Sequence, residues 1–164
     1  MSIAHWPGLR TCAVLVYLAF AAPPAVGQEP ISHAQGQLRT ETLEILTHSG
    51  VHRFRVEIAA TWRQQEIGLM FRPPMPPGHG MLFELGRPQV ANFWMKNCPA
   101  PLDMLFIGAD GKILTIAANT TPYSEQGVGS GGPITGVLEL RGGRAAEIDA
   151  EPGDIVRHRY FHDE

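Results

Sequence analysis

Along most of the chain after residue 38, apolar and polar positions alternate with the period of two that is typical of half-buried β-strands. Leu43 and Ile45 flank Glu44, and residues 54–58 alternate in the same way. Further alternating or apolar runs follow at 81–85, 93–96, 102–107, 112–117, 134–140 and 154–160. We therefore predict one mainly-β domain over residues 38–164 with seven or eight short strands. Its expected form is an antiparallel sandwich, a jelly roll or a partly closed barrel.

Local signals place the connections between these strands. A turn at 47–50 and the Asp110-Gly111 pair each predict a hairpin, since glycine supplies the positive φ of a tight turn. Thr61 and Gln64 have capping-box spacing, which predicts a short helix over about 61–71, ended by the prolines from Pro73. A helical turn is expected at 144–148. The glycine-rich stretch 119–133 is expected to be a long polar loop.

The N-terminal part has the pattern of a secretory signal. Arg10 precedes an apolar run over 12–22, and Ala25 and Gly27 provide small residues before a cleavage site. The run is too short for a membrane span, so we expect residues 1–27 to be removed, with no span left in the mature chain. Residues 28–37 are expected to be a flexible tether. The protein is predicted to be periplasmic or extracellular.

Composition narrows the class of partner. Hydrophobic residues make up 44% of the chain and charged residues 18%, which suits a packed domain rather than a disordered one. With 13 basic and 16 acidic residues the formal net charge is −3, so a nucleic-acid partner is not expected. A small ligand or a protein remains as the partner, and the oligomeric state is open.

No specific catalytic, metal or cofactor motif is present. Cys98, the one cysteine after the signal, has only Lys96 nearby to lower its pKa, which favours a structural role. The pairs His48/His52 and His158/His162 have no third ligand close in sequence, so we interpret them as surface residues. We therefore expect no catalytic residue, no metal and no cofactor.

The stretch from Asn92 to Asp103 combines a large aromatic, a cation, an amide and a carboxylate next to a proline bend. Alternation places Trp94 and Lys96 opposite Phe93 and Met95, so one pair faces the core and the other a groove or solvent. Alternatively, Trp94 belongs to the core and Asp103 accepts backbone N–H bonds at the bend.

Several short motifs resemble those of the domain-of-unknown-function 192 family of small, often exported prokaryotic proteins. The resemblance covers about residues 56–156 and rests on the motifs at 68–72, 80–83, 93–97, 101–103, 137–140 and 153–154. It implies a compact mainly-β fold of sandwich or jelly-roll type with a short helix, and no established activity. The family usually has threonine where this chain has Cys98.

Polar residues inside these apolar motifs form the candidate ligand-binding site, because a buried charge must be paired or face a ligand. They are Arg72, Lys96, Asn97, Asp103 and Glu139, and Trp94 is added as the aromatic ring on the same strand face as Lys96. We expect a binding module for a small polar or anionic ligand or a peptide. One alternative is an accessory domain without a ligand, in which Arg72 pairs with Asp103 or Glu139. The other is a hydrolase that uses Asp103 and Glu139 as acid and base.

Overall fold

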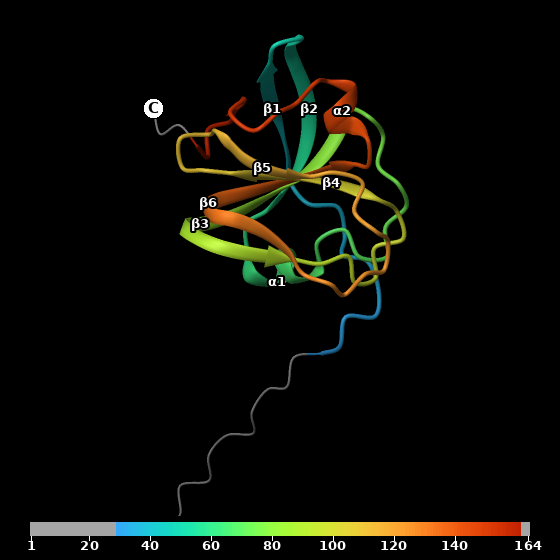
Figure 1. Cartoon of the computed structure of the whole chain (residues 1–164). Helices are drawn as coiled ribbons and strands as arrows, with labels where there is room; N and C mark the ends of the chain where they lie inside the picture. Colours follow the sequence, from blue (N-terminus) through green and yellow to red (C-terminus); the bar gives the residue numbers. More distant parts are fainter. Residues whose placement is uncertain (1–28, 162–164) are drawn as a thin grey trace, which may run out of the picture. The chain divides into compact units, whose positions relative to one another are not determined.

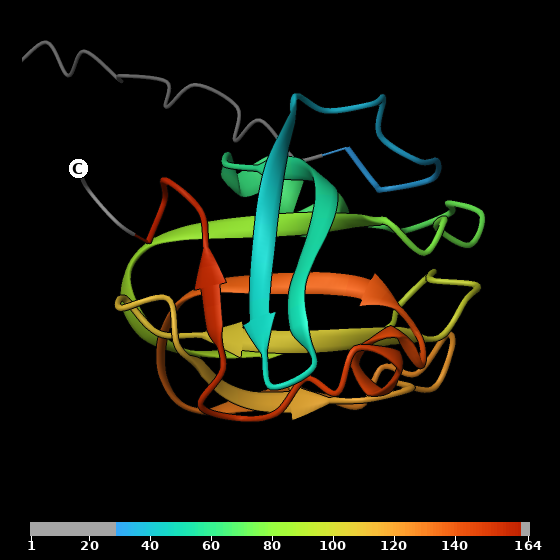
Figure 2. The same ribbon diagram turned by 90° about the horizontal axis from the view of Figure 1, so that it is seen from above.

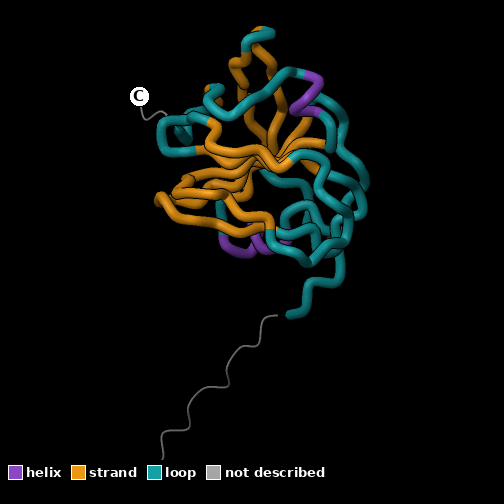
Figure 3. The backbone as a smooth tube through the Cα atoms, in the orientation of Figure 1, coloured by secondary structure: helices purple, strands orange, loops and turns teal. Residues whose placement is uncertain are grey.

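Seven strands form a single curled sheet in the computed structural model, which describes residues 29–161 (Figure 1). The predicted signal peptide, residues 1–27, lies outside this range. The strands are β1 (Thr40–Thr47), β2 (Gly50–Ala59), β3 (His79–Phe93), β4 (Leu102–Ile107), β5 (Ile113–Ala117), β6 (Val128–Arg141) and β7 (Ile155–Arg157). The helices are α1 (Trp62–Ile67) and α2 (Arg144–Glu147). Both are short and lie at the periphery of the strands (Figure 3).

The sheet has the order β5-β4-β6-β3-β2-β1-β7 and nearly closes on itself. All neighbouring pairs are antiparallel except β2 and β3. The two edges meet where Lys112 forms a bridge with Ile155 and the N–H of Ile113 donates to Asp154 O at 2.9 Å. Figure 2 shows the β1–β2 hairpin crossing over β3 and β6. The mainly-β fold is confirmed, in the form of the partly closed barrel.

Curling gives the central strands apolar neighbours on both faces. Every residue of β4 is buried, which explains why all of them except Asp103 are apolar. On β6, Leu138 and Leu140 join one core cluster with Phe54 and Val156, whereas Val137 joins a second cluster with Met81. The second cluster lies next to the candidate site described below.

The expected hairpins are confirmed, since β1 pairs with β2 across 47–50 and β4 pairs with β5 across the Asp110-Gly111 turn. The helical turn expected at 144–148 is α2. Helix α1 is shorter than expected, because Gly68 adopts φ 48° and ends it. Residues 119–133 are only partly loop. From Val128 onward they belong to β6, because the partner strand β3 supplies the hydrogen bonds that glycine-rich sequence alone does not predict.

The segment expected to be a flexible tether differs from that expectation. The Gln35 side chain donates to Gln64 O at 3.0 Å and to Gly68 O at 2.9 Å, at the end of α1. Ile31 and Leu38 pack against the second core cluster. The chain is therefore attached to the domain well before β1 begins. Between residues 29 and 161 no helix has the length and apolar character needed to cross a membrane.

Candidate functional site

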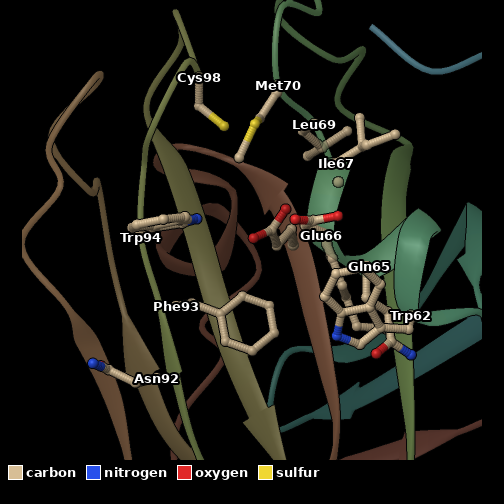
Figure 4. Close-up of a pocket in the computed structure, with 13 residues that line it drawn as sticks. Trp62, Gln65, Glu66, Ile67, Leu69, Met70, Asn92, Phe93, Trp94 and Cys98 are labelled. Carbon is tan, nitrogen blue, oxygen red and sulfur yellow. The ribbon is translucent and has the colours of Figure 1, made fainter. Parts of the chain in front are cut away.

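A cavity of about 280 Å³ lies between α1, the end of β3 and the chain that follows β3. We call it the α1–β3 cavity. Trp62 and Glu66 of α1 line it, together with Phe93 and Trp94 at the end of β3 and Glu139 of β6. Figure 4 shows Trp62 and Trp94 on opposite sides of this space. The cavity is at the small end of the range for ligand pockets, so it suits a small molecule or the tip of a longer one.

Local sequence fixes the α1 wall. The Thr61 hydroxyl accepts from Gln64 N at 3.3 Å and the Gln64 side chain accepts from Thr61 N at 3.0 Å, which completes the predicted capping box. The amide of Gln65 donates to Ala59 O at 3.1 Å and to Glu84 O at 2.7 Å. These bonds attach the helix to β2 and β3, so the wall is rigid.

The opposite wall is the chain that follows Phe93. Met95 is buried, whereas Trp94 is 46% exposed, as the alternation predicts. Asn97 then adopts φ 56° and its carbonyl accepts from Phe71 N at 2.7 Å. This bond joins the two walls at one end. The role of Asn97 is to shape the backbone, because its side chain reaches only Met70 Sδ, at 3.8 Å.

Glu139 is the buried acid of the cavity. It is 4% exposed, and its strand neighbours are Met81 on β3 and Met104 on β4. In the described part of the chain its carboxyl has no hydrogen-bond or ion-pair partner. Burial raises the pKa of Glu139 to about 8. The group is therefore mostly protonated at neutral pH.

Cys98 lines the same cavity and is buried. Burial, and then the nearby Glu139 carboxyl, raise the pKa of the Cys98 thiol to about 12. A thiolate is the nucleophilic form, so Cys98 has the chemistry of a small apolar side chain here.

Two aromatic rings are unusually open at the cavity. Trp62 is 59% exposed and Trp94 is 46% exposed. Lys96 places its Nζ 5.1 Å from the centre of the Trp94 ring and 3.9 Å from a carboxylate oxygen of Glu125. Lys96 thus pairs with neither Asp103 nor Glu139, and its side chain lies near the mouth without lining the cavity.

Arg72 lies elsewhere. Its Nη1 is 2.5 Å from Glu57 Oε1, and its Nη2 donates to Gln35 O and Gly36 O at 3.3 and 3.0 Å. The alternative pairing with Asp103 or Glu139 does not occur, because the parallel β2–β3 contact brings Glu57 to this side of the domain. Arg72 fastens the N-terminal segment instead.

Asp103 is fully buried and accepts three backbone N–H bonds. They come from Asn119 at 2.8 Å, Gly143 at 3.0 Å and Ala145 at 2.7 Å. Asp103 faces Leu140 across the β4–β6 ladder, one position along from Glu139. Successive strand residues point to opposite faces, so Asp103 and Glu139 lie on opposite faces of the sheet. This geometry does not bring them together as an acid and base.

Of the six candidate residues, the structure therefore brings Trp94 and Glu139 to the cavity, and places the other four in structural or peripheral positions. The sequence analysis did not single out Trp62 and Glu66 of the predicted helix as site residues. A signal for these residues was present in the sequence. Trp62 and Glu66 are four positions apart, so a helix places an aromatic ring and a carboxylate side by side on one face.

No cluster of three or more metal-ligating side chains occurs within residues 29–161. His158 corrects the surface interpretation of its pair. It is buried, and its Nε2 lies 2.9 Å from Glu41 Oε2, while Arg159 Nε reaches the same oxygen at 2.7 Å. Burial lowers the pKa of His158.

The fold and site together define a small mainly-β protein with a curled sheet and a cavity that holds a buried carboxyl. The chain belongs to the DUF192 family, described as "Uncharacterized ACR, COG1430", whose model matches residues 44–158. Comparison with curated proteins found no match.

Two solved structures are similar to this chain. One is a protein from Sinorhizobium meliloti 1021 whose description proposes a transcription regulator. It is 41% identical, with a TM-score of 0.74, and the match covers 77% of this chain and 99% of that one. The other is a protein of unknown function from Novosphingobium aromaticivorans DSM 12444. It is 39% identical, with a TM-score of 0.73, over 93% of this chain and 100% of that one.

Proposed function

We propose that this protein is a binding module that takes a small ligand into the α1–β3 cavity. The observation that carries the proposal is Glu139, a buried carboxyl without a partner in a space flanked by two open indole rings. A buried polar group without a hydrogen bond destabilises the folded state, so such a group at a cavity wall is typical of a binding site.

The class of ligand differs from the sequence expectation. The lining residues include two carboxyls, Glu66 and Glu139, and no basic side chain among residues 29–161. A wall of this kind disfavours an anion. The proposal is therefore a binding module for a neutral or cationic ligand, not an anionic one.

Other functions have less support. The opposite orientation of Asp103 and Glu139 removes the basis for a two-carboxylate hydrolase. Regulation of transcription is not proposed for this chain, because a net charge of −3 gives no attraction for a phosphate backbone.

Export of the module is a separate proposal. We propose that it acts outside the cytoplasm, supported by the apolar run over 12–22 and the small residues Ala25 and Gly27. An extracytoplasmic binding module would meet small solutes directly.

An NMR titration tests the binding proposal. A soluble fragment set of amines, polyols and carboxylates is titrated into 15N-labelled protein. We expect at least one non-anionic fragment to shift amides of α1 and of the chain after Phe93. Ile67→Trp, which adds bulk at the cavity wall, should abolish the shifts, whereas Leu114→Ala, an exposed apolar site on β5, should retain them. If no fragment shifts the amide signals of residues around the cavity in the folded protein, the result would favour the accessory domain without a ligand.

A further inference from the structure

The carboxyl without a partner in the α1–β3 cavity is Glu139. The Glu66 carboxylate is 2.7 Å from Arg63 Nη1, so a basic neighbour already compensates it. The Glu139 carboxyl has no corresponding neighbour in the described chain and is 4% exposed. A cation at this place would supply the missing partner, because a buried carboxylate is stable only when it is paired.

The aromatic walls complement a cation too. The faces of tryptophan rings attract ammonium groups, and Trp62 and Trp94 are both open at the mouth. The chain itself provides an example, since the ammonium of Lys96 lies 5.1 Å from the centre of the Trp94 ring. Phe93 and Met70 add apolar surface for a short alkyl chain.

We infer that the α1–β3 cavity binds an alkylammonium group, with the cation beside Glu139 and its carbons against the aromatic walls. This inference rests on the proposed function and names its ligand class. The cavity of about 280 Å³ admits a small free amine or the tip of a lysine side chain, which share this chemistry.

Binding of a cation is coupled to the Glu139 proton. In the empty cavity burial keeps the pKa of this group at about 8, and a bound ammonium favours its ionised form. At neutral pH the Glu139 O–H therefore loses its proton to solvent as the cation enters. Affinity for the cation should rise with pH towards 8, by up to about tenfold per pH unit.

The titratable groups that line the cavity or lie near its mouth set the controls. Glu66 and Arg63 come from α1, and Lys96 and the Cys98 thiol come from the chain after β3. The strand neighbours Met81 and Met104 carry no charge. Lys96 repels a second cation and occupies part of the Trp94 ring, so its removal should strengthen binding.

The test compares n-butylammonium with two matched probes, neutral 1-butanol and anionic butyrate. The chain contains three tryptophans, Trp6, Trp62 and Trp94, so in full-length protein with Trp6→Phe all indole emission comes from the cavity mouth. We expect butylammonium to change this emission, and calorimetry to detect proton release at pH 7. Butyrate should not bind.

Matched variants locate the interaction. Glu139→Gln should weaken butylammonium by about tenfold or more and remove its pH dependence. Trp94→Ala should weaken the binding of butylammonium, measured by NMR, by about three- to fivefold. Lys96→Met should bind at least as tightly as the parent, and Leu114→Ala should be unchanged. Acetyl-lysine-amide and a lysine-containing peptide then distinguish a free amine from a peptide side chain as the source.

Four results separate the two proposals. Equal binding of 1-butanol and butylammonium, or undiminished binding of butylammonium in Glu139→Gln, would overturn the ammonium inference while leaving a ligand site. Binding of a polyol fragment alone would do the same. If no probe of any charge binds the folded protein in the cavity, the proposed function fails, and this inference fails with it.

Discussion

At the scale of single residues, Glu139 is where function and stability conflict. Its carboxyl is buried against apolar neighbours without a partner, so ionising it destabilises the folded protein. Residues retained under such a cost are typical of binding sites, where a ligand supplies the missing partner.

The free energy of unfolding should fall as pH rises from about 4.5 to about 8. Across this range the folded protein keeps a Glu139 proton that the unfolded chain has lost, because burial raises the pKa from 4.5 to about 8. The loss should reach at most about 1.4 kcal/mol per pH unit, and it should level off above pH 8. Urea denaturation at several pH values measures it.

Glu139→Gln should remove most of this dependence and be more stable than the parent at pH 8. Glu66→Gln is the matched control on the same cavity, and it should keep the parent's pH dependence because Glu139 is intact in this variant. An unchanged pH profile in Glu139→Gln would show that Glu139 ionises freely in the folded state.

Asp103 is the contrasting carboxylate, because backbone N–H groups donate hydrogen bonds to both of its oxygens. Asp103→Asn replaces one acceptor oxygen with a donor amide that faces an N–H, and should cost about 2–4 kcal/mol of unfolding free energy. Asp154→Asn is the control, because Asp154 Oδ2 accepts from Glu151 N at 2.8 Å in an exposed turn. It should cost less than about 1 kcal/mol. Equal losses in the two variants would contradict the buried role of Asp103.

At the scale of elements, the end of β3 connects the core to the cavity. Phe93 packs edge-on against Phe83 and Phe106, with ring centres 5.2 and 6.1 Å apart, and its other side lines the cavity. The alternation continues past the end of the strand as far as Met95, whose N–H donates to Ser124 O at 2.8 Å.

Phe93→Ala and Lys96→Ala should therefore differ strongly. Loss of the half-buried Phe93 ring should cost about 2–4 kcal/mol, since it leaves Phe83 and Phe106 without their partner. Lys96→Ala should cost less than about 1 kcal/mol, because its ammonium is near the surface and 3.9 Å from Glu125. Denaturant unfolding of both variants measures the difference. A loss for Lys96→Ala as large as that for Phe93→Ala would mean that Lys96 is a buried structural cation.

At the scale of the whole molecule, the curled sheet places the cavity away from the seam where β5 and β7 meet. The bridge at Lys112 and Ile155 closes this seam, while α1 and the chain after β3 cover the cavity. The proposed ligand site and the closure of the barrel thus involve different parts of the fold.

The mature protein should begin at Gln28 and be found outside the cytoplasm. The reason is the apolar run over 12–22 followed by small residues at Ala25 and Gly27. N-terminal sequencing of protein from the extracytoplasmic fraction measures this. A replacement of Ala25 and Gly27 by larger residues should slow the cleavage. Intact Met1 on cytoplasmic protein would contradict export.

Much of the secondary structure was predictable from the sequence, because its signals are local. The period-two pattern at 54–58, the Asp110-Gly111 turn and the Thr61 capping box each depend on residues a few positions apart. Glycine-rich residues 128–133 and the docked Gln35 were not predictable, since their hydrogen bonds come from distant segments.

By itself, the sequence determined the mainly-β class, most element positions and the set of polar residues that needed an explanation. Only the tertiary structure decided which of these residues have partners. The chain after β5 and the start of α2 supply the backbone N–H groups that bond to Asp103. The β4–β6–β3 register instead places Glu139 between Met104 and Met81 without a partner, although both residues are acids inside apolar motifs. Partners across a sheet depend on strand order and register, which arise from the packing of the whole chain and have no local signal.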